Sequence, residues 1–201
     1  MQDKNRYALK EWAIVLKALT EGRQTLLLRK GGLIEKQKRF TVEHPEFFIY
    51  PTYLHQQRKG VVPEMAADLD QLLISPPSED QVILTHYAVV RTAVPITDLE
   101  MLSRLGEHHV FTSDEVSKRF AYGKAPGLNL LLIRVCRLPQ PFCLPILPHY
   151  AGCRSWVDLG RELPTAGCRP VLNDDVFDRK ITDILAIAKP VNPSSPGLKG
   201  T

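Results

Sequence analysis

Apolar residues occur along this chain in short continuous runs that turns and prolines separate. Four such runs lie at residues 25–28, 47–50, 82–94 and 128–138. Several of them are rich in β-branched or aromatic residues, which favour the pleated, half-buried surface of a sheet. The pattern therefore predicts strands at all four places, with residues 82–94 forming one long strand or two short ones.

A fifth apolar run, residues 12–19, is interrupted only by Lys17 and is followed by turn-like residues around Gly22. It predicts the first strand of a β-hairpin that returns through residues 25–28. A helix through residues 10–19 is the alternative, because alanine, leucine and lysine are good helix formers.

Four segments carry the signals of helices. Pro63 opens the first, which has acidic early turns and an apolar stripe. Capping-box patterns that begin at Thr97 and Thr112 open the next two, and an amphipathic stretch forms the last. The predicted helices are residues 63–74, 97–105, 112–120 and 174–188.

Two further segments bear on how the strands are connected. Residues 107–111 predict a short strand, whereas residues 139–148 are rich in proline and predict irregular structure. The fold class that follows is α+β, with small antiparallel sheets or a partly closed barrel, short helices and a C-terminal helix.

Residues 75–80, Ser-Pro-Pro-Ser-Glu-Asp, are the best candidate for a linker. We therefore expect an N-terminal α/β part at residues 1–75 and a second α+β part at residues 76–190. The two would pack together as one globular unit. The polar residues 191–201 predict a disordered tail.

Composition places the chain among ordinary globular proteins. It has 201 residues, of which 44% are hydrophobic and 24% charged. It contains no apolar stretch of membrane-spanning length, and its first residues lack the apolar core of a signal peptide. We expect a cytoplasmic protein with no membrane partner, in which the four cysteines are reduced thiols.

Charge is unevenly distributed around a net value of +4. Residues 1–60 carry 12 lysines and arginines against 6 acidic residues, whereas residues 61–120 carry 4 against 10. A basic first third is compatible with binding of RNA or DNA. The plainer interpretation is a solvated surface, because no run of five like charges occurs.

The leading candidate site lies where two of the predicted strands end. Its members combine cations, glycines and hydrogen-bonding side chains. They are Arg29, Lys30, Gly31, Gly32, Glu35, Thr52, His55 and Gln56.

Each residue type in this set suggests a role. Arg29 and Lys30 can hold a phosphate, and the amides of the two glycines can add a nest for an anion. His55 can act as acid or base, with Glu35 orienting it or binding a metal. A hairpin turn with local ion pairs is the alternative interpretation.

Histidines and cysteines offer weaker candidates. His149 and Cys153 have the spacing of one helical turn, and His86, His108 and His109 supply further potential ligands. No second closely spaced pair completes a zinc site, so no metal is assigned. Cys153 is better explained as a small buried residue than as a nucleophile.

Two arginines lie within the strand at residues 128–138. By alternation, Arg134 and Arg137 point to opposite faces of the sheet. An arginine on an otherwise apolar face usually pairs with a carboxylate or contacts a ligand. Both are therefore added to the phosphate-binding candidates.

Several segments together resemble the largely cyanobacterial family catalogued as domain of unknown function 1802. The resemblance covers roughly residues 7–165. It rests on residues 28–32 with Glu35, 50–52, 55–56, 119–120, 132–138 and 152–156. It implies no activity, because none is assigned to that family. The strands with arginine-rich ends are also similar, at the level of fold alone, to small RNA-binding barrels of the PUA and ASCH type.

The function expected from these features is a binding module for nucleic acid or a phosphorylated ligand. A metal-dependent phosphoesterase or nuclease is the first alternative, with Glu35 binding Mg²⁺ and His55 acting as general base. An interaction or scaffold protein is the second. The cofactor is unknown, and Mg²⁺ enters only under the enzyme alternative.

Overall fold

The computed structural model of the chain describes residues 1–30, 33–36, 39–54, 56–150 and 155–188. Of residues 33–36 and 39–41 the backbone alone is described. In this part of the chain, no helix is long and apolar enough to cross a membrane.

Seven of the described strands form one curved sheet, in the order β2-β7-β6-β5-β1-β8, with β9 also paired to β7. β1 and β5 are parallel and every other pair is antiparallel. The sheet strands are β1 (Lys4–Trp12), β2 (Leu26–Arg29), β5 (Glu46–Thr52), β6 (Gln81–Ile96), β7 (Leu128–Pro145), β8 (Trp156–Pro164) and β9 (Arg169–Pro170). The path ends at β2 and β8, so the sheet of the described residues does not close into a barrel. β3 (Leu33–Lys36) and β4 (Arg39–Val42) form a separate two-stranded hairpin.

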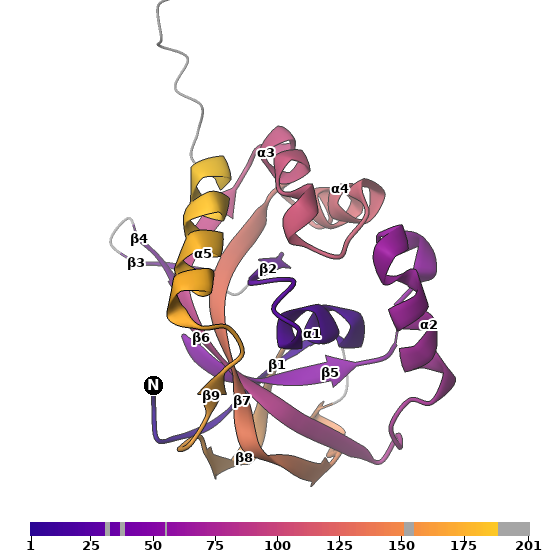
Figure 1. Cartoon of the computed structure of the whole chain (residues 1–201), viewed down its shortest axis with the longest axis vertical. Coiled ribbons are helices and arrows are strands. Elements are labelled where there is room, and N and C mark those ends of the chain that lie inside the picture. The colour runs from indigo at the N-terminus through magenta and orange to yellow at the C-terminus, as the bar shows by residue number, and fades with distance from the viewer. Residues whose placement is uncertain (31–32, 37–38, 55, 151–154, 189–201) are drawn as a thin grey trace, which may run out of the picture.

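The helices gather on one side of this sheet, as Figure 1 shows, with α1 seated against β5 and α5 beside the long β6–β7 pair. The α-helices are α1 (Ala13–Thr20), α2 (Ala66–Ile74), α3 (Leu99–Arg104), α4 (Ser113–Ala121) and α5 (Asp174–Ala188). Short 3₁₀ turns occur at Arg58–Gly60, Pro63–Met65, Gly106–His108 and Pro148–Tyr150. The expected α+β class, with a C-terminal helix, is confirmed.

The predicted hairpin at residues 12–28 is wrong, and the helical alternative is correct. α1 buries Ile14, Val15, Ala18 and Leu19, which fall on one face of a helix but on both faces of a strand. The sequence of this segment is compatible with both a strand and a helix, and burial of one helix face against the sheet selects the helix.

Two smaller predictions are also wrong. The segment predicted as a strand at residues 107–111 is a 3₁₀ turn followed by a single bridge between Val61 and Phe111. The segment predicted as irregular from residue 139 continues in β7 as far as Pro145, because pairing with β6 resumes at Phe142.

Both helices with predicted capping boxes form, but only the cap of α4 is the predicted residue, because α3 is capped by Asp98 instead of Thr97. The Asp98 carboxylate accepts a hydrogen bond from the amide of Glu100 at 2.9 Å and opens α3. The Thr112 hydroxyl accepts one from the amide of Glu115 at 3.4 Å and opens α4. β5 and β6, which lie on either side of residue 75, pair in the same sheet. The proposed division into two parts there stays a prediction.

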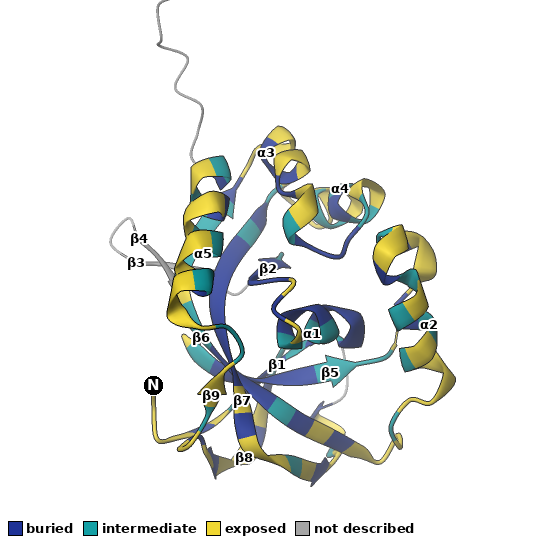
Figure 2. Ribbon diagram, viewed as in Figure 1, coloured by how far each residue is buried: buried dark blue, intermediate teal, exposed yellow. Residues whose placement is uncertain are grey.

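Two hydrophobic clusters divide the interior, and β7 contributes to both. The larger holds α1, β2 and the first half of β7, whereas the smaller holds Leu138 and Leu144 from its second half. Every residue of β7 from Leu130 to Cys136 is buried, and exposure begins at Arg137 (Figure 2). The change takes place where the strand itself changes register.

Candidate functional site

The pairing of β6 with β7 breaks at one point. Leu84 pairs with Phe142 and His86 pairs with Arg137, so residues 138–141 of β7 stand opposite Thr85 alone. Pro139 and Pro141 lie in this bulge and have no amide hydrogen to donate to the ladder. Bulges of this kind bend a strand and redirect its side chains, and they are common beside binding sites.

A cleft of about 570 Å³ opens beside the bulge. α1, the segment after β5, α2 and the bulge supply its walls. Its lining is mainly apolar with a few polar groups, which is usual for sites that hold small molecules. The lining residues are Ala13, Leu16, Lys17, Thr20, Glu21, Pro51, Tyr53, Leu72, Thr85, His86, Arg137, Leu138, Pro139 and Pro141.

His86 is the buried polar residue of this lining, with 5% of its surface exposed. Its Nδ1 lies 2.8 Å from the hydroxyl of Thr85. Its Nε2 is buried and has no hydrogen-bond partner in the described part of the chain. Burial, with a smaller contribution from the charge of Arg137, lowers the pKa of His86 from 6.5 to about 4. The ring is therefore neutral at pH 7.

The two cations of the cleft differ in their surroundings. Lys17 lies 2.6 Å from the carboxylate of Glu21 and 3.6 Å from that of Asp68, and its hydrogen bond to Glu21 raises its pKa. Arg137 is exposed, and its guanidinium has no ion pair or hydrogen bond with any residue that the structure describes. Arg137 is thus the cation that remains available to an incoming anion.

Tyr53 supplies an aromatic ring to the same cleft. It follows β5 directly and is half-buried. Burial raises the pKa of its hydroxyl, so the side chain is neutral at physiological pH.

Arg29, the first of the predicted phosphate ligands, lies elsewhere and has internal partners. Its guanidinium donates to the carboxylate of Glu11 at 2.8 Å and to the carbonyl oxygen of Lys10 at 3.0 Å. Glu11 is only 4% exposed, so this is a buried ion pair. Its other carboxylate oxygen accepts from the amide of Trp12 at 2.9 Å.

Lys30 joins two distant segments. Its ammonium group donates to the carbonyl oxygens of Phe120, Ala125 and Gly127 at 2.8, 2.6 and 3.0 Å. Three backbone acceptors match the three hydrogens of an ammonium group. The side chain thereby fixes the loop between α4 and β7.

Thr52 and Gln56 organise the start of α1. The Gln56 side-chain oxygen accepts from the amide of Ile14 at 3.0 Å, and its nitrogen donates to the carbonyl of Thr52 at 2.8 Å. The Thr52 hydroxyl donates to the carbonyl of Glu11 at 3.1 Å. Gln56 therefore caps a helix whose own preceding residue, Trp12, provides no side-chain acceptor.

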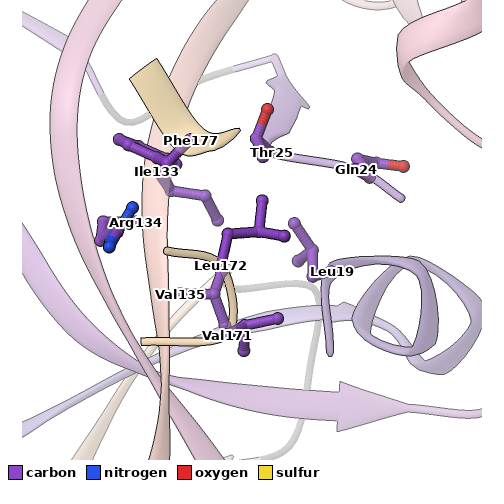
Figure 3. Close-up of a pocket in the computed structure, with 9 residues that line it drawn as sticks. All are labelled: Leu19, Gln24, Thr25, Ile133, Arg134, Val135, Val171, Leu172 and Phe177. Atoms are coloured by element: carbon purple, nitrogen blue, oxygen red, sulfur yellow. The ribbon is translucent and has the colours of Figure 1, made fainter. Parts of the chain in front are cut away.

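Arg134 is enclosed on the opposite face of β7 from Arg137. It donates to the carboxylate of Asp174 at 2.6 Å and to the carbonyl of Asn173 at 3.3 Å, and its guanidinium lies 4.5 Å from the ring centre of Phe177. Figure 3 shows it beside a cavity that Gln24, Thr25 and several apolar residues also line.

That cavity has a volume of about 10 Å³. This is close to the space that a single water molecule occupies, and Gln24, Thr25 and Arg134 supply polar groups around it. A ligand of any size does not fit, so Arg134 serves to attach the start of α5 to the sheet.

The remaining predicted residues lie outside what the structure describes. Gly31, Gly32 and His55 are among these, as is Cys153, and the side chain of Glu35 is not described although its backbone belongs to β3. The predicted catalytic pair of Glu35 and His55 therefore stays a prediction. The described residues contain no group of three or more potential metal ligands.

Comparison with known proteins identifies the family. The model of a family described as "Domain of unknown function (DUF1802)" matches residues 8–183. The chain belongs to the DUF1802 family. The resemblance found in the sequence is confirmed, and it carries no activity with it.

Solved structures add a distant likeness for this DUF1802 member. The ASCH protein of Zymomonas mobilis is 14% identical, covers 88% of this chain and 93% of its own, and has a TM-score of 0.44. A single-residue variant of that protein is 15% identical, covers 90% and 98%, and has a TM-score of 0.41. Likeness at this level carries no argument for function. No curated protein matches the chain.

Among the residues that line the cleft, Arg137 was predicted from the sequence as a phosphate ligand, which stays a prediction, and His86 was considered only as a metal ligand. Tyr53 and the bulge were not predicted. The signal available was the pair Pro139 and Pro141 within a run of apolar residues that continues beyond them. Pro139 and Pro141, separated by one residue, interrupt the hydrogen bonds of β7 to β6. They do not end β7, because β6 is long enough for pairing to resume beyond them.

Proposed function

We propose that this DUF1802 protein is a binding module for nucleic acid or a phosphorylated ligand, and that the phosphate binds in the cleft beside the β7 bulge. One observation carries the proposal. Arg137 stands without an ion-pair partner among the described residues at a cleft of about 570 Å³, whereas Arg29, Lys30 and Arg134 have partners inside the fold.

Arginine suits this role because its planar guanidinium presents paired donors that match two phosphate oxygens. The cleft lies in the range of roughly 300–1,000 Å³ that is usual for ligand sites. Glu21 also lines it, but its carboxylate accepts hydrogen bonds from Lys17 and Arg23, and that from Lys17 is the main cause of its lowered pKa. The local balance therefore favours an anion.

The test is a titration of labelled single-stranded RNA and DNA at several salt concentrations, with inorganic pyrophosphate as a competitor. One phosphate contact gives a log–log salt slope of about 0.7–0.9. We expect the binding constant to show a slope in this range, and we expect pyrophosphate to compete with the labelled nucleic acid and abolish its binding. Arg137→Gln should weaken binding at least about tenfold, which is typical for the loss of a charged hydrogen bond.

Arg91→Gln is the matched control. Arg91 is an exposed arginine of β6 and does not line the cleft. The proposal is wrong if no phosphate-bearing probe binds, or if Arg137→Gln and Arg91→Gln weaken binding equally. A slope several times larger would indicate contact with a wide basic surface instead.

A further inference from the structure

Besides Arg137, the proposed phosphate ligand, the cleft has two lining residues that phosphate binding does not require. His86 brings a buried ring nitrogen without a partner in the described chain, and Tyr53 brings an aromatic ring. An unsatisfied buried polar atom destabilises a folded protein and is retained at few positions. The presence of this atom beside a cleft whose cation, Arg137, has no ion-pair partner among the described residues points to a second position of ligand recognition.

We infer that the cleft binds one nucleotide unit, whose phosphate contacts Arg137 while its base stacks on Tyr53 and hydrogen-bonds to His86. This inference rests on the proposed function and specifies its ligand. The apolar side chains of Leu16, Leu72 and Leu138 complete a surface suited to the flat face of a base.

The register of the sheet links the two polar groups. His86 and Arg137 are direct partners across the β6–β7 ladder, so their side chains share one face and start from neighbouring positions. The His86 nitrogen is covered in the fold as described. His86 itself lines the cleft, so a ligand that displaces the side chains covering Nε2 brings the edge of its base to this nitrogen.

The neutral imidazole is suited to reading a base edge. Its Nδ1 faces the Thr85 hydroxyl, which can donate or accept, so Nε2 can take the complementary role. Nε2 thus offers either one donor or one acceptor. We expect a preference for bases whose edge presents the complementary group, an acceptor or a donor, to this nitrogen.

The test is isothermal titration calorimetry with the four nucleoside monophosphates and with ribose 5-phosphate. We expect the best nucleotide to bind at least about tenfold more tightly than ribose 5-phosphate, as for one stacked base. Tyr53→Leu should remove this difference, and Tyr53→Phe should keep it. When the titration is repeated with NMR detection, the ring proton signals of His86 should shift as the nucleotide is added.

Further probes separate the sources of the nucleotide. A single-stranded tetranucleotide that binds more tightly than the monophosphate, with the same dependence on Tyr53, indicates nucleic acid. Equal affinity for the two indicates a free nucleotide. Either result supports the inference.

Three results would overturn it. If ribose 5-phosphate binds as tightly as every nucleotide and Arg137→Gln abolishes both, the phosphate site stands and the base site does not. If Tyr53→Leu keeps the preference for nucleotides, the base lies elsewhere. If no phosphate-bearing probe binds, both the inference and the proposed function fail.

Discussion

Arg134 and Arg137 lie three residues apart in β7, yet their surroundings are opposite. Arg134 is 7% exposed, contacts Asp174, Asn173 and Phe177, and borders a cavity of about 10 Å³. Arg137 is exposed, has no such partner in the described chain, and borders a cleft of about 570 Å³. The same side chain therefore serves the fold in one place and remains available to a ligand in the other.

The difference arises from what covers each face of the strand. α5 begins at Asp174, separated from the last sheet strand by three residues, and brings its first turn over Arg134. Arg137 keeps His86 and Arg169 as ladder partners, but the bulge that follows it leaves residues 138–141 without pairs on β6, and the cleft opens there. A cation within a strand is therefore informative about function only when its internal partners are known.

The largest effect on stability is expected where a charge is fully enclosed. Arg29→Met leaves the carboxylate of Glu11 buried without its partner, and should lower the free energy of unfolding by about 3–5 kcal/mol. Urea unfolding followed by tryptophan fluorescence measures it. The double variant with Glu11→Leu should recover part of the loss. A single variant within about 1 kcal/mol of the parent would mean that enclosed pairs do not stabilise this fold.

Acid should destabilise the fold through two buried histidines. The pKa of both His86 and His109 is lowered to about 4, mainly by burial. Between about pH 6.5 and 4 the unfolded chain binds more protons than the folded one, so stability is full above this window and falls as the pH drops through it. Each histidine should contribute about 3 kcal/mol to that fall.

His109→Asn tests this expectation. Its amide oxygen can replace the ring nitrogen that accepts from the amide of Phe111 at 3.2 Å, but it does not titrate. Urea unfolding at pH 7, 5.5 and 4.5 should show a shallower loss of stability than in the parent. An unchanged pH dependence would contradict the role of His109.

Arg134→Met should cost about 1–2 kcal/mol. The Asp174 carboxylate is 89% exposed, which makes the ion pair weak, so the contact with Phe177 supplies most of the loss. Thermal unfolding at neutral pH measures it. The affinity for nucleotide or phosphate should be unchanged. If Arg134→Met instead loses binding at unchanged stability, Arg134 contacts the ligand and is not a structural residue.

Arg137→Met should have the smallest effect on stability, within about 0.5 kcal/mol, as for an exposed side chain that no described residue contacts through a hydrogen bond or ion pair. It should also abolish phosphate-dependent binding. Thermal unfolding and ligand binding should therefore give opposite results for the two variants: Arg134→Met loses stability and keeps binding, whereas Arg137→Met keeps stability and loses binding. A destabilisation of Arg137→Met as large as that of Arg134→Met would show that the arginine is structural.

The sequence predicted elements whose signals are local. α5 was expected at its observed bounds because its apolar positions repeat with helical spacing, and α4 because Thr112 caps it. α1 was predicted wrongly because its run fits a strand or a helix, and only contact with the sheet decides. Gln56 caps it from a position 42 residues away, which no local pattern reveals.

The site was less accessible to prediction for a related reason. Residue types identified Arg29, Lys30, Arg134 and Arg137 equally well as possible phosphate ligands. Which of them meets a carboxylate or a row of carbonyl oxygens depends on long-range pairing, as between Lys30 and Gly127. The register break that opens the cleft is likewise a property of two strands together.

The bulge at residues 138–141 also separates β7 into two lengths of strand that hold their registers independently. An insertion or deletion in this segment would alter the wall of the cleft while the pairs on either side stay in place. Variation among family members is therefore expected to concentrate there. The sheet would act as a constant framework and the bulge as an exchangeable loop, in the way that antibody frameworks carry different binding loops.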